Sequence, residues 1–170
     1  MSRASRLICA TAAAALAAIL GSPASAASVF AVQTDNWYIG SLTNSCIAFN
    51  RLPKEYNHSP YNSLTIHAPK DGGYLIEVMF WPGPIKHGER YSLALRVEGR
   101  GSYEIDADGV YDIGVKSRGP IPDKLVKDLQ TERMLTVGTS NIPVSLGFDT
   151  TRMDDVFTHL DDCRRMIAKQ

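Results

Sequence analysis

The side chains that could perform acid–base chemistry are spread along the chain. Glu77, Glu89, Asp106 and Asp108 are candidates for the carboxylate pair of a glycoside hydrolase, which must face each other across about 5 to 9.5 Å. No Gly-x-Ser-x-Gly elbow, phosphate-binding loop, dinucleotide fingerprint or His-Glu-x-x-His motif accompanies them. We therefore assign no catalytic residue and keep an exported hydrolase of cell-wall or glycan material as an alternative.

Residues that bind metals are equally dispersed. The segment Asp106-Ala107-Asp108-Gly109-Val110-Tyr111-Asp112 has the acidic spacing of a calcium loop without its distal glutamate. Its Asp-Gly pair lies between two strand-like runs and favours a hairpin turn. We expect the histidines to be solvated or hydrogen-bonded and not zinc ligands; they are His58, His67, His87 and His159. The sequence predicts no metal and no cofactor.

The first 26 residues have the pattern of a secretory signal peptide. Arg3 and Arg6 form a positive region, an apolar run follows from Leu7 to Leu20, and Ala24-Ser25-Ala26 resembles a cleavage site. The run is shorter than the roughly 20 residues that span a membrane. We expect this signal peptide to be removed, leaving one β-rich domain over residues 27–170 that is not membrane-spanning. The predicted location is the bacterial periplasm or the medium.

Charge and cysteine content narrow the class of protein further. Lys and Arg number 18, as do Asp and Glu, so no basic field predicts a nucleic-acid partner. Cys46 and Cys163 lie near the two ends of the expected domain, and an isolated pair in an oxidising compartment is typical of a disulfide. Catalytic or metal-binding thiols are the alternative, but neither cysteine belongs to a Cys-x-x-Cys or Cys/His cluster.

The elements that must position these residues are mostly strands. Apolar and polar residues alternate with period two between Gly, Pro, Asn and Asp, and Leu64-x-Ile66-x-Ala68 places three apolar side chains on one face. This pattern predicts a mainly β protein, an antiparallel β-sandwich or barrel-like domain. The predicted strands are 29–33, 37–41, 46–50, 63–68, 74–81, 91–98, 102–105, 110–115, 135–139 and 142–147.

Two segments follow a helical period instead. A short helix is predicted over 122–131, with Pro122 in its first turn. A C-terminal helix is predicted after Thr150 or Thr151 as N-cap. The expected apolar stripes are Leu125, Val126 and Leu129 in the first helix and Met153, Val156, Phe157, Leu160, Cys163 and Ile167 in the second. A bond from Cys163 to Cys46 would fasten the last helix to an early strand.

An aromatic and proline-rich stretch follows one predicted strand. Trp81, Pro82, Pro84 and His87 could form an exposed interaction loop, because Trp and Tyr contribute strongly to binding. In a small inhibitor of a secreted enzyme, a further alternative, the loop 82–88 would be the inhibitory element. A strand end that packs its aromatic residues into the core is the interpretation we favour, and we extend it to the pair Trp37-Tyr38.

The order of these features is itself informative. Trp37 precedes Cys46, a Pro-Gly-Pro loop precedes the strand ending in Val97-Glu98-Gly99, and the segment 142–148 runs through Ser-Leu-Gly-Phe into the last helix and Cys163. This order resembles the invasion-associated locus B family of bacterial exported proteins, although the stretch 102–119 lacks a cysteine pair that typical members carry. The resemblance implies a compact, mostly β exported protein, linked in some relatives to host-cell invasion, without established enzymatic activity.

The expectations for function agree with one another. An export signal and a well-patterned core, together with no recognisable catalytic spacing, predict a non-catalytic periplasmic or secreted protein-interaction module. Its expected partner is a protein or another component of the envelope.

Overall fold

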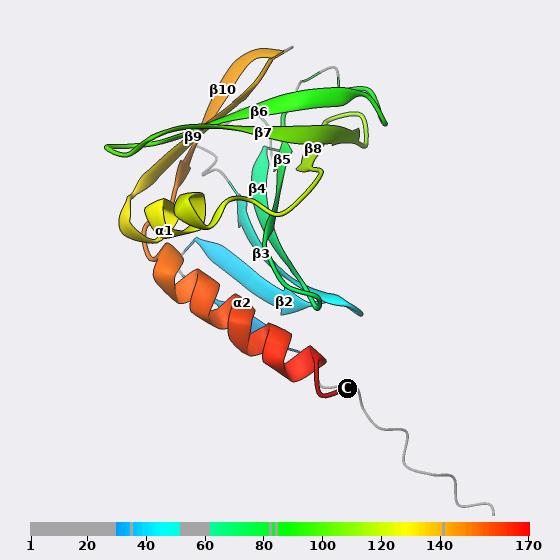
Figure 1. Ribbon diagram of the computed structural model, residues 1–170, viewed down its shortest axis with the longest axis vertical. Helices are drawn as coiled ribbons and strands as arrows, with labels where there is room; N and C mark the ends of the chain where they lie inside the picture. Colours follow the sequence, from blue (N-terminus) through cyan, green and yellow to red (C-terminus); the bar gives the residue numbers. More distant parts are fainter. Residues whose placement is uncertain (1–29, 35, 52–61, 82, 84, 141) are drawn as a thin grey trace, which may run out of the picture.

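The computed structural model describes residues 30–34, 36–51, 62–81, 83, 85–140 and 142–170 (Figure 1). The expected signal peptide lies outside the described residues, as do His58, Pro82 and Pro84. The strands are β1 (Ala31–Gln33), β2 (Trp37–Ser41), β3 (Ser45–Arg51), β4 (Ser63–Pro69), β5 (Leu75–Met79), β6 (Arg90–Val97), β7 (Gly101–Val110), β8 (Gly114–Ser117), β9 (Met134–Thr139) and β10 (Ile142–Asp149). The helices are α1 (Asp123–Thr131) and α2 (Met153–Ile167).

The ten strands form one antiparallel sheet in the order β1-β2-β3-β4-β5-β8-β7-β6-β9-β10. The sheet bends strongly, so that β6 and β7 run roughly across the direction of β3 and β4 (Figure 1). It does not close, because β1 and β10 are its two edges. The prediction of a mainly antiparallel β protein with two helices is confirmed, and the architecture is a single bent, open sheet.

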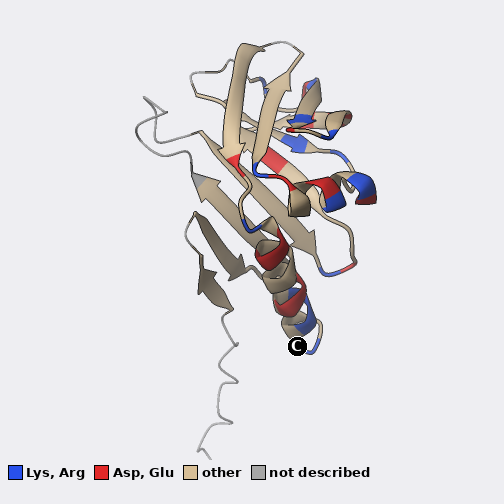
Figure 2. Ribbon diagram, turned by 90° about the vertical axis from the view of Figure 1, so that its left-hand side faces the viewer, with Lys and Arg blue, Asp and Glu red and all other residues tan. Residues whose placement is uncertain are grey.

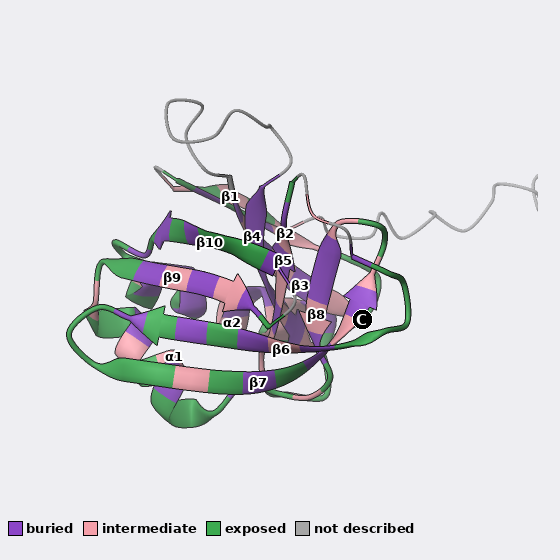
Figure 3. Cartoon of the chain, turned by 90° about the horizontal axis from the view of Figure 1, so that it is seen from above, coloured by how far each residue is buried: buried purple, intermediate pink, exposed green. Residues whose placement is uncertain are grey.

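Alternation along the strands creates the core. In β6 the inward-facing Tyr91, Leu93, Leu95 and Val97 are buried, and Figure 3 shows buried and exposed residues taking turns along this strand. The same period places Trp37 inside and Tyr38 outside on β2. The largest fully buried side chains are Trp37, Phe80, Phe148 and Phe157.

The C-terminal helix α2 packs against β2, β3, β4 and α1. Its predicted apolar stripe is buried, and Cys163 forms a disulfide with Cys46 of β3, with the two Cα atoms 6.1 Å apart. This bond is consistent with the pairing expected from the sequence. Tyr74 contacts α2 at two residues. Its ring packs edge-on against Phe157, with the ring centroids 4.8 Å apart, and its hydroxyl donates to Asp161 Oδ1 at 2.7 Å.

The start of α2 differs from the prediction. The N-cap is Arg152, in the left-handed conformation with φ 63°, and not Thr150 or Thr151. Thr150 is buried, and its hydroxyl donates to the carbonyl oxygen of Glu132 just after α1 at 2.7 Å. The backbone N–H of Thr151 donates to Asp149 Oδ1 at 2.8 Å. Both threonines therefore serve the connection between β10 and α2 and do not cap the helix.

The predicted hairpin turn at Asp106–Gly109 is also wrong. Strand β7 continues through it to Val110, and the turn comes at Tyr111–Ile113, where Tyr111 has φ 63°. Period two persists because Ala107 and Gly109 face inward. A Cβ at Gly109 would lie 2.2 Å from the carbonyl oxygen of Lys86, so this glycine permits a close approach of two backbone segments and does not form a turn.

Candidate functional site

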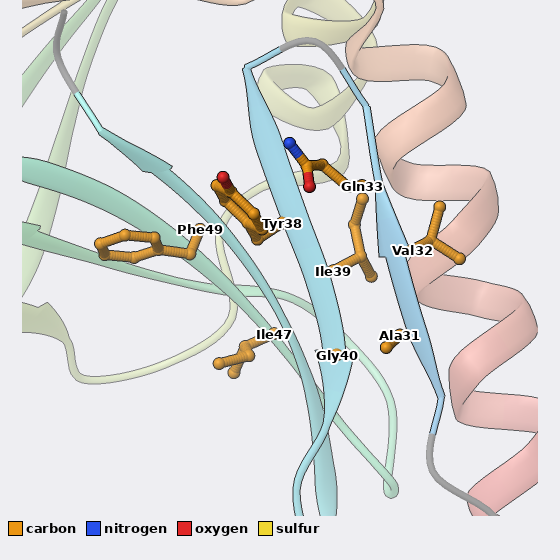
Figure 4. A pocket seen from close by; sticks show the side chains of 8 residues that line it. All are labelled: Ala31, Val32, Gln33, Tyr38, Ile39, Gly40, Ile47 and Phe49. Atoms are coloured by element: carbon orange, nitrogen blue, oxygen red, sulfur yellow. The ribbon is translucent and has the colours of Figure 1, made fainter.

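An apolar hollow of about 510 Å³ lies over the first three strands of the sheet (Figure 4). Its volume falls within the range of roughly 300 to 1,000 Å³ that is common for ligand pockets. Only two of the lining residues, Gln33 and Tyr38, carry polar side-chain atoms. The lining residues are Ala31, Val32, Gln33, Tyr38, Ile39, Gly40, Ile47 and Phe49.

Strand register explains why the outer face is hollow here. Gly40 of β2 lies between its Cα partners Ala31 on β1 and Ile47 on β3. The neighbouring partners are Tyr38 and Phe49, two large aromatic residues on the same face. Gly40 and Ala31 therefore form the floor of the hollow, and the larger side chains of Tyr38 and Phe49 form its walls. A Cβ at Gly40 would have only the Phe30 carbonyl oxygen, at 3.7 Å, as a near neighbour, so no close backbone contact requires glycine there.

The aromatic wall of the hollow is accessible. Tyr38 is 56% exposed, and Leu42, further along the outer side of the same chain segment, is 49% exposed. The sequence interpretation that placed both Trp37 and Tyr38 in the core is therefore wrong for Tyr38. An exposed aromatic residue beside an apolar hollow is typical of an interaction site.

A polar cluster continues the outer face toward the middle of the sheet. His67 Nε2 of β4 lies 2.9 Å from Glu77 Oε2 of β5, and Lys116 Nζ of β8 lies 3.8 Å from the same oxygen. The side chains of His67 and Glu77 are only 14% and 13% exposed. The imidazole and the ammonium group thus satisfy the carboxylate of Glu77 within the sheet surface.

The four candidate hydrolase carboxylates are not gathered around the hollow. Glu77 and Asp108 lie on strands either side of Lys116, and Asp108 Oδ1 is 3.6 Å from Arg118 Nε. Asp106 is exposed, and Glu89 Oε1 pairs with Lys86 Nζ at 3.0 Å on the surface. None of the four lines the hollow over β1–β3.

The remaining histidines are also separated. His87 is exposed in the turn before β6, whereas His159 on α2 lines a second, polar hollow beside β1. Across the described part of the chain, no three His, Cys, Asp or Glu side chains gather closely enough to hold a metal ion.

The predicted interaction loop is only partly described. Phe80 is buried, whereas Trp81 is 46% exposed and its backbone N–H donates to Asn62 Oδ1. The favoured interpretation, aromatic packing in the core, is therefore right for Phe80 and wrong for Trp81. Within this stretch, Ile85 is bound to the β7–β8 turn, because its N–H donates to the carbonyl oxygen of Asp112 at 3.1 Å.

Among the residues that the structure describes, most charged ones lie on the helices and the turns, and the strands facing the viewer in Figure 2 are largely uncharged. One charged cluster joins α1 to β7: the hydroxyl of Tyr103 donates to Asp128, and Lys124 Nζ donates to that hydroxyl at 2.9 Å. The hydrogen bond from Tyr103 holds the pKa of Asp128 below its ordinary value. Next to α2, burial and then the hydrogen bond to Asp161 of that helix raise the pKa of Tyr74, which directly precedes β5. Both clusters fasten helices to the sheet.

Sequence reasoning did not identify the hollow over β1–β3. The available signal was Gly40, because an isolated glycine within a strand pattern can mark a site where a ligand approaches the backbone. Its meaning depends on Ala31 and Ile47, which become neighbours only through strand pairing.

Comparisons with known proteins address the fold. No family model matches the sequence, and no curated protein matches it. Neither helix in the described ranges is long and apolar enough to cross a membrane. Among solved structures, the chain is similar to the crystal structure of invasion associated protein B from Bartonella henselae, with a TM-score of 0.60 and 14% identity over 80% of this chain and 99% of that one. The chain therefore has the fold of invasion associated protein B, in agreement with the resemblance seen in its sequence.

Proposed function

We propose that the chain is a non-catalytic, exported interaction module that binds a protein or another envelope component through the outer face of β1–β3. The observation that carries this proposal is the apolar hollow beside Tyr38, which is 56% exposed. Burying such a surface against a partner releases water from apolar area, which stabilises the complex by about 25 cal/mol per Å² before the costs of association.

Three features support the exported part of the proposal. The sequence begins with the pattern of a signal peptide. Cys46 and Cys163 form a disulfide, a bond that persists in oxidising compartments. The fold is that of a bacterial protein described as invasion associated. A periplasmic or secreted location accounts for all three.

The arrangement of the polar residues favours binding over hydrolysis. Glu77 is engaged by His67 and Lys116, and Lys116 separates it from Asp108. A glycoside hydrolase needs two carboxylates that face each other across a substrate groove. These side chains instead lie in a cross-strand row on the sheet surface.

A photo-crosslinking experiment in intact cells tests the proposal. The photoreactive residue p-benzoylphenylalanine replaces Tyr38 in the hollow or, as the matched control, Met134 of β9, which is 40% exposed. We expect an adduct of defined mass from position 38 and none of that mass from position 134. The adduct should disappear when Gly40→Val fills the floor of the hollow.

Two results would contradict the proposal. Equal crosslinking from both positions, or none from position 38, would show that the hollow has no specific partner. Release of soluble fragments from purified peptidoglycan by the protein, abolished by Glu77→Gln, would favour the hydrolase.

A further inference from the structure

We propose that the partner binds by strand addition: an extended segment of another protein pairs with the free edge of β1. This segment carries apolar residues on one face and acidic residues on the other. The inference rests on the proposed interaction function and specifies the chemistry of its partner.

The backbone of β1 offers unused hydrogen-bonding groups. The N–H of Thr34 donates to the carbonyl oxygen of Trp37 at 2.9 Å, which makes this a bonded pair of the β1–β2 ladder. Bonded and non-bonded pairs alternate in an antiparallel ladder, so Ala31 and Gln33 fall in non-bonded pairs. Their N–H and C=O groups therefore point away from β2, and no described residue bonds to them. A strand placed along this edge would satisfy them.

Space is present on both sides of this edge. The apolar hollow lies over β1 and β2, where Ala31 and Gly40 leave room for a large side chain. A second hollow, of about 690 Å³, lies beside β1 and the first half of α2. It is lined by Val32, Gln33, Thr34, Arg152 and His159. Because successive side chains of a strand point to opposite faces, an added strand would direct one set into each environment.

The two environments specify different side chains. The apolar hollow, on the outer face of β1–β3, has Tyr38 as its accessible aromatic residue. The second hollow, between β1 and α2, is polar: it is lined by Arg152 and His159 and by no carboxylate. Arg152 also pairs with Asp155 at 2.6 Å, so an acidic partner would share its guanidinium. Charge complementarity therefore favours apolar residues outward and Glu or Asp inward.

Fluorescence anisotropy with two labelled heptapeptides tests this inference on the purified protein. One peptide alternates valine and glutamate, and the other alternates valine and lysine. We expect the glutamate peptide to bind about tenfold more tightly. Gln33→Ala and Gln33→Pro both remove the glutamine side chain, but only the proline also removes the edge N–H, and it does so without touching a β1–β2 bond. We expect Gln33→Pro to bind the glutamate peptide about tenfold more weakly than Gln33→Ala.

A second pair of variants tests the outer hollow without altering the edge. Gly40→Val fills the hollow and should weaken binding of the glutamate peptide about tenfold. The matched control, Gly101→Val, adds the same side chain where a Cβ would have no atom within 4 Å, and should leave binding unchanged. Circular dichroism verifies that each variant is folded.

The outcomes separate this inference from the proposed function. No binding of the glutamate peptide up to millimolar concentration, or equal affinity of Gln33→Pro and Gln33→Ala, would overturn strand addition. If crosslinking from position 38 in cells then persists, the interaction function stands and only the mode of binding is wrong. If neither the peptide binds nor position 38 crosslinks, both strand addition and the interaction function are overturned.

Discussion

Removal of the disulfide between Cys46 and Cys163 should destabilise the protein strongly. The bond joins residues 117 positions apart in the sequence. In the chain-entropy model, opening a loop of this length lowers the free energy of unfolding by up to about 5 kcal/mol. For a domain of this size, that loss corresponds to a decrease of about 10 to 20 °C in Tm.

Urea denaturation of the wild type and of Cys46→Ala, Cys163→Ala and the double variant measures this loss. Each single variant opens the same loop as the double variant, so we expect all three to agree within about 1 kcal/mol of one another. Hydrogen exchange should increase most in α2, because the bond fastens this helix to β3. A double variant within about 1 kcal/mol of the oxidised wild type would show that the disulfide contributes little to stability.

Three further predictions concern single contacts. Gly109→Ala should lower the free energy of unfolding by about 1 to 3 kcal/mol in urea titrations, because its Cβ would lie 2.2 Å from the Lys86 carbonyl oxygen; an unchanged value contradicts this packing. Burial and then the bond to Asp161 raise the pKa of Tyr74 from 10.0, so the folded state holds the phenolic proton more tightly and stability falls as pH rises above about 10. Tyr74→Phe should flatten this decline in urea midpoints, and an equally steep decline would argue against the cause. Tyr103→Phe should raise the pKa of the Asp128 carboxyl, measured by NMR titration, and no change would exclude their hydrogen bond as the cause of the lowered pKa.

Local patterns predicted most elements because they depend on short-range geometry. Period-two alternation located β2 with its observed bounds, Trp37–Ser41, and helical spacing identified the buried stripe of α2. The same alternation also places Tyr38 and Trp81 outside, since each follows a buried aromatic residue. Assigning these two residues to the core gave residue type more weight than position in the strand.

Apart from the disulfide, which the isolated cysteine pair indicated, the features that depend on distant segments could not be predicted. The Asp-Gly pair at 108–109 is typical of a turn, but it lies within β7, where Gly109 gives room to the backbone of Lys86, a segment that only the fold brings near. The pairing of β5 with β8 and of β6 with β9 likewise departs from chain order. The hollow over Gly40 could not be predicted either, because strand register decides which residues surround this glycine.

The native molecular mass of the protein in gently extracted envelope or culture medium tests the interaction function most directly. We expect the wild type and Gly101→Val to migrate in one species heavier than the monomer, and Gly40→Val to migrate as the monomer because its hollow is filled. A monomeric wild type, or a Gly40→Val variant that stays in the heavy species, would contradict the interaction function.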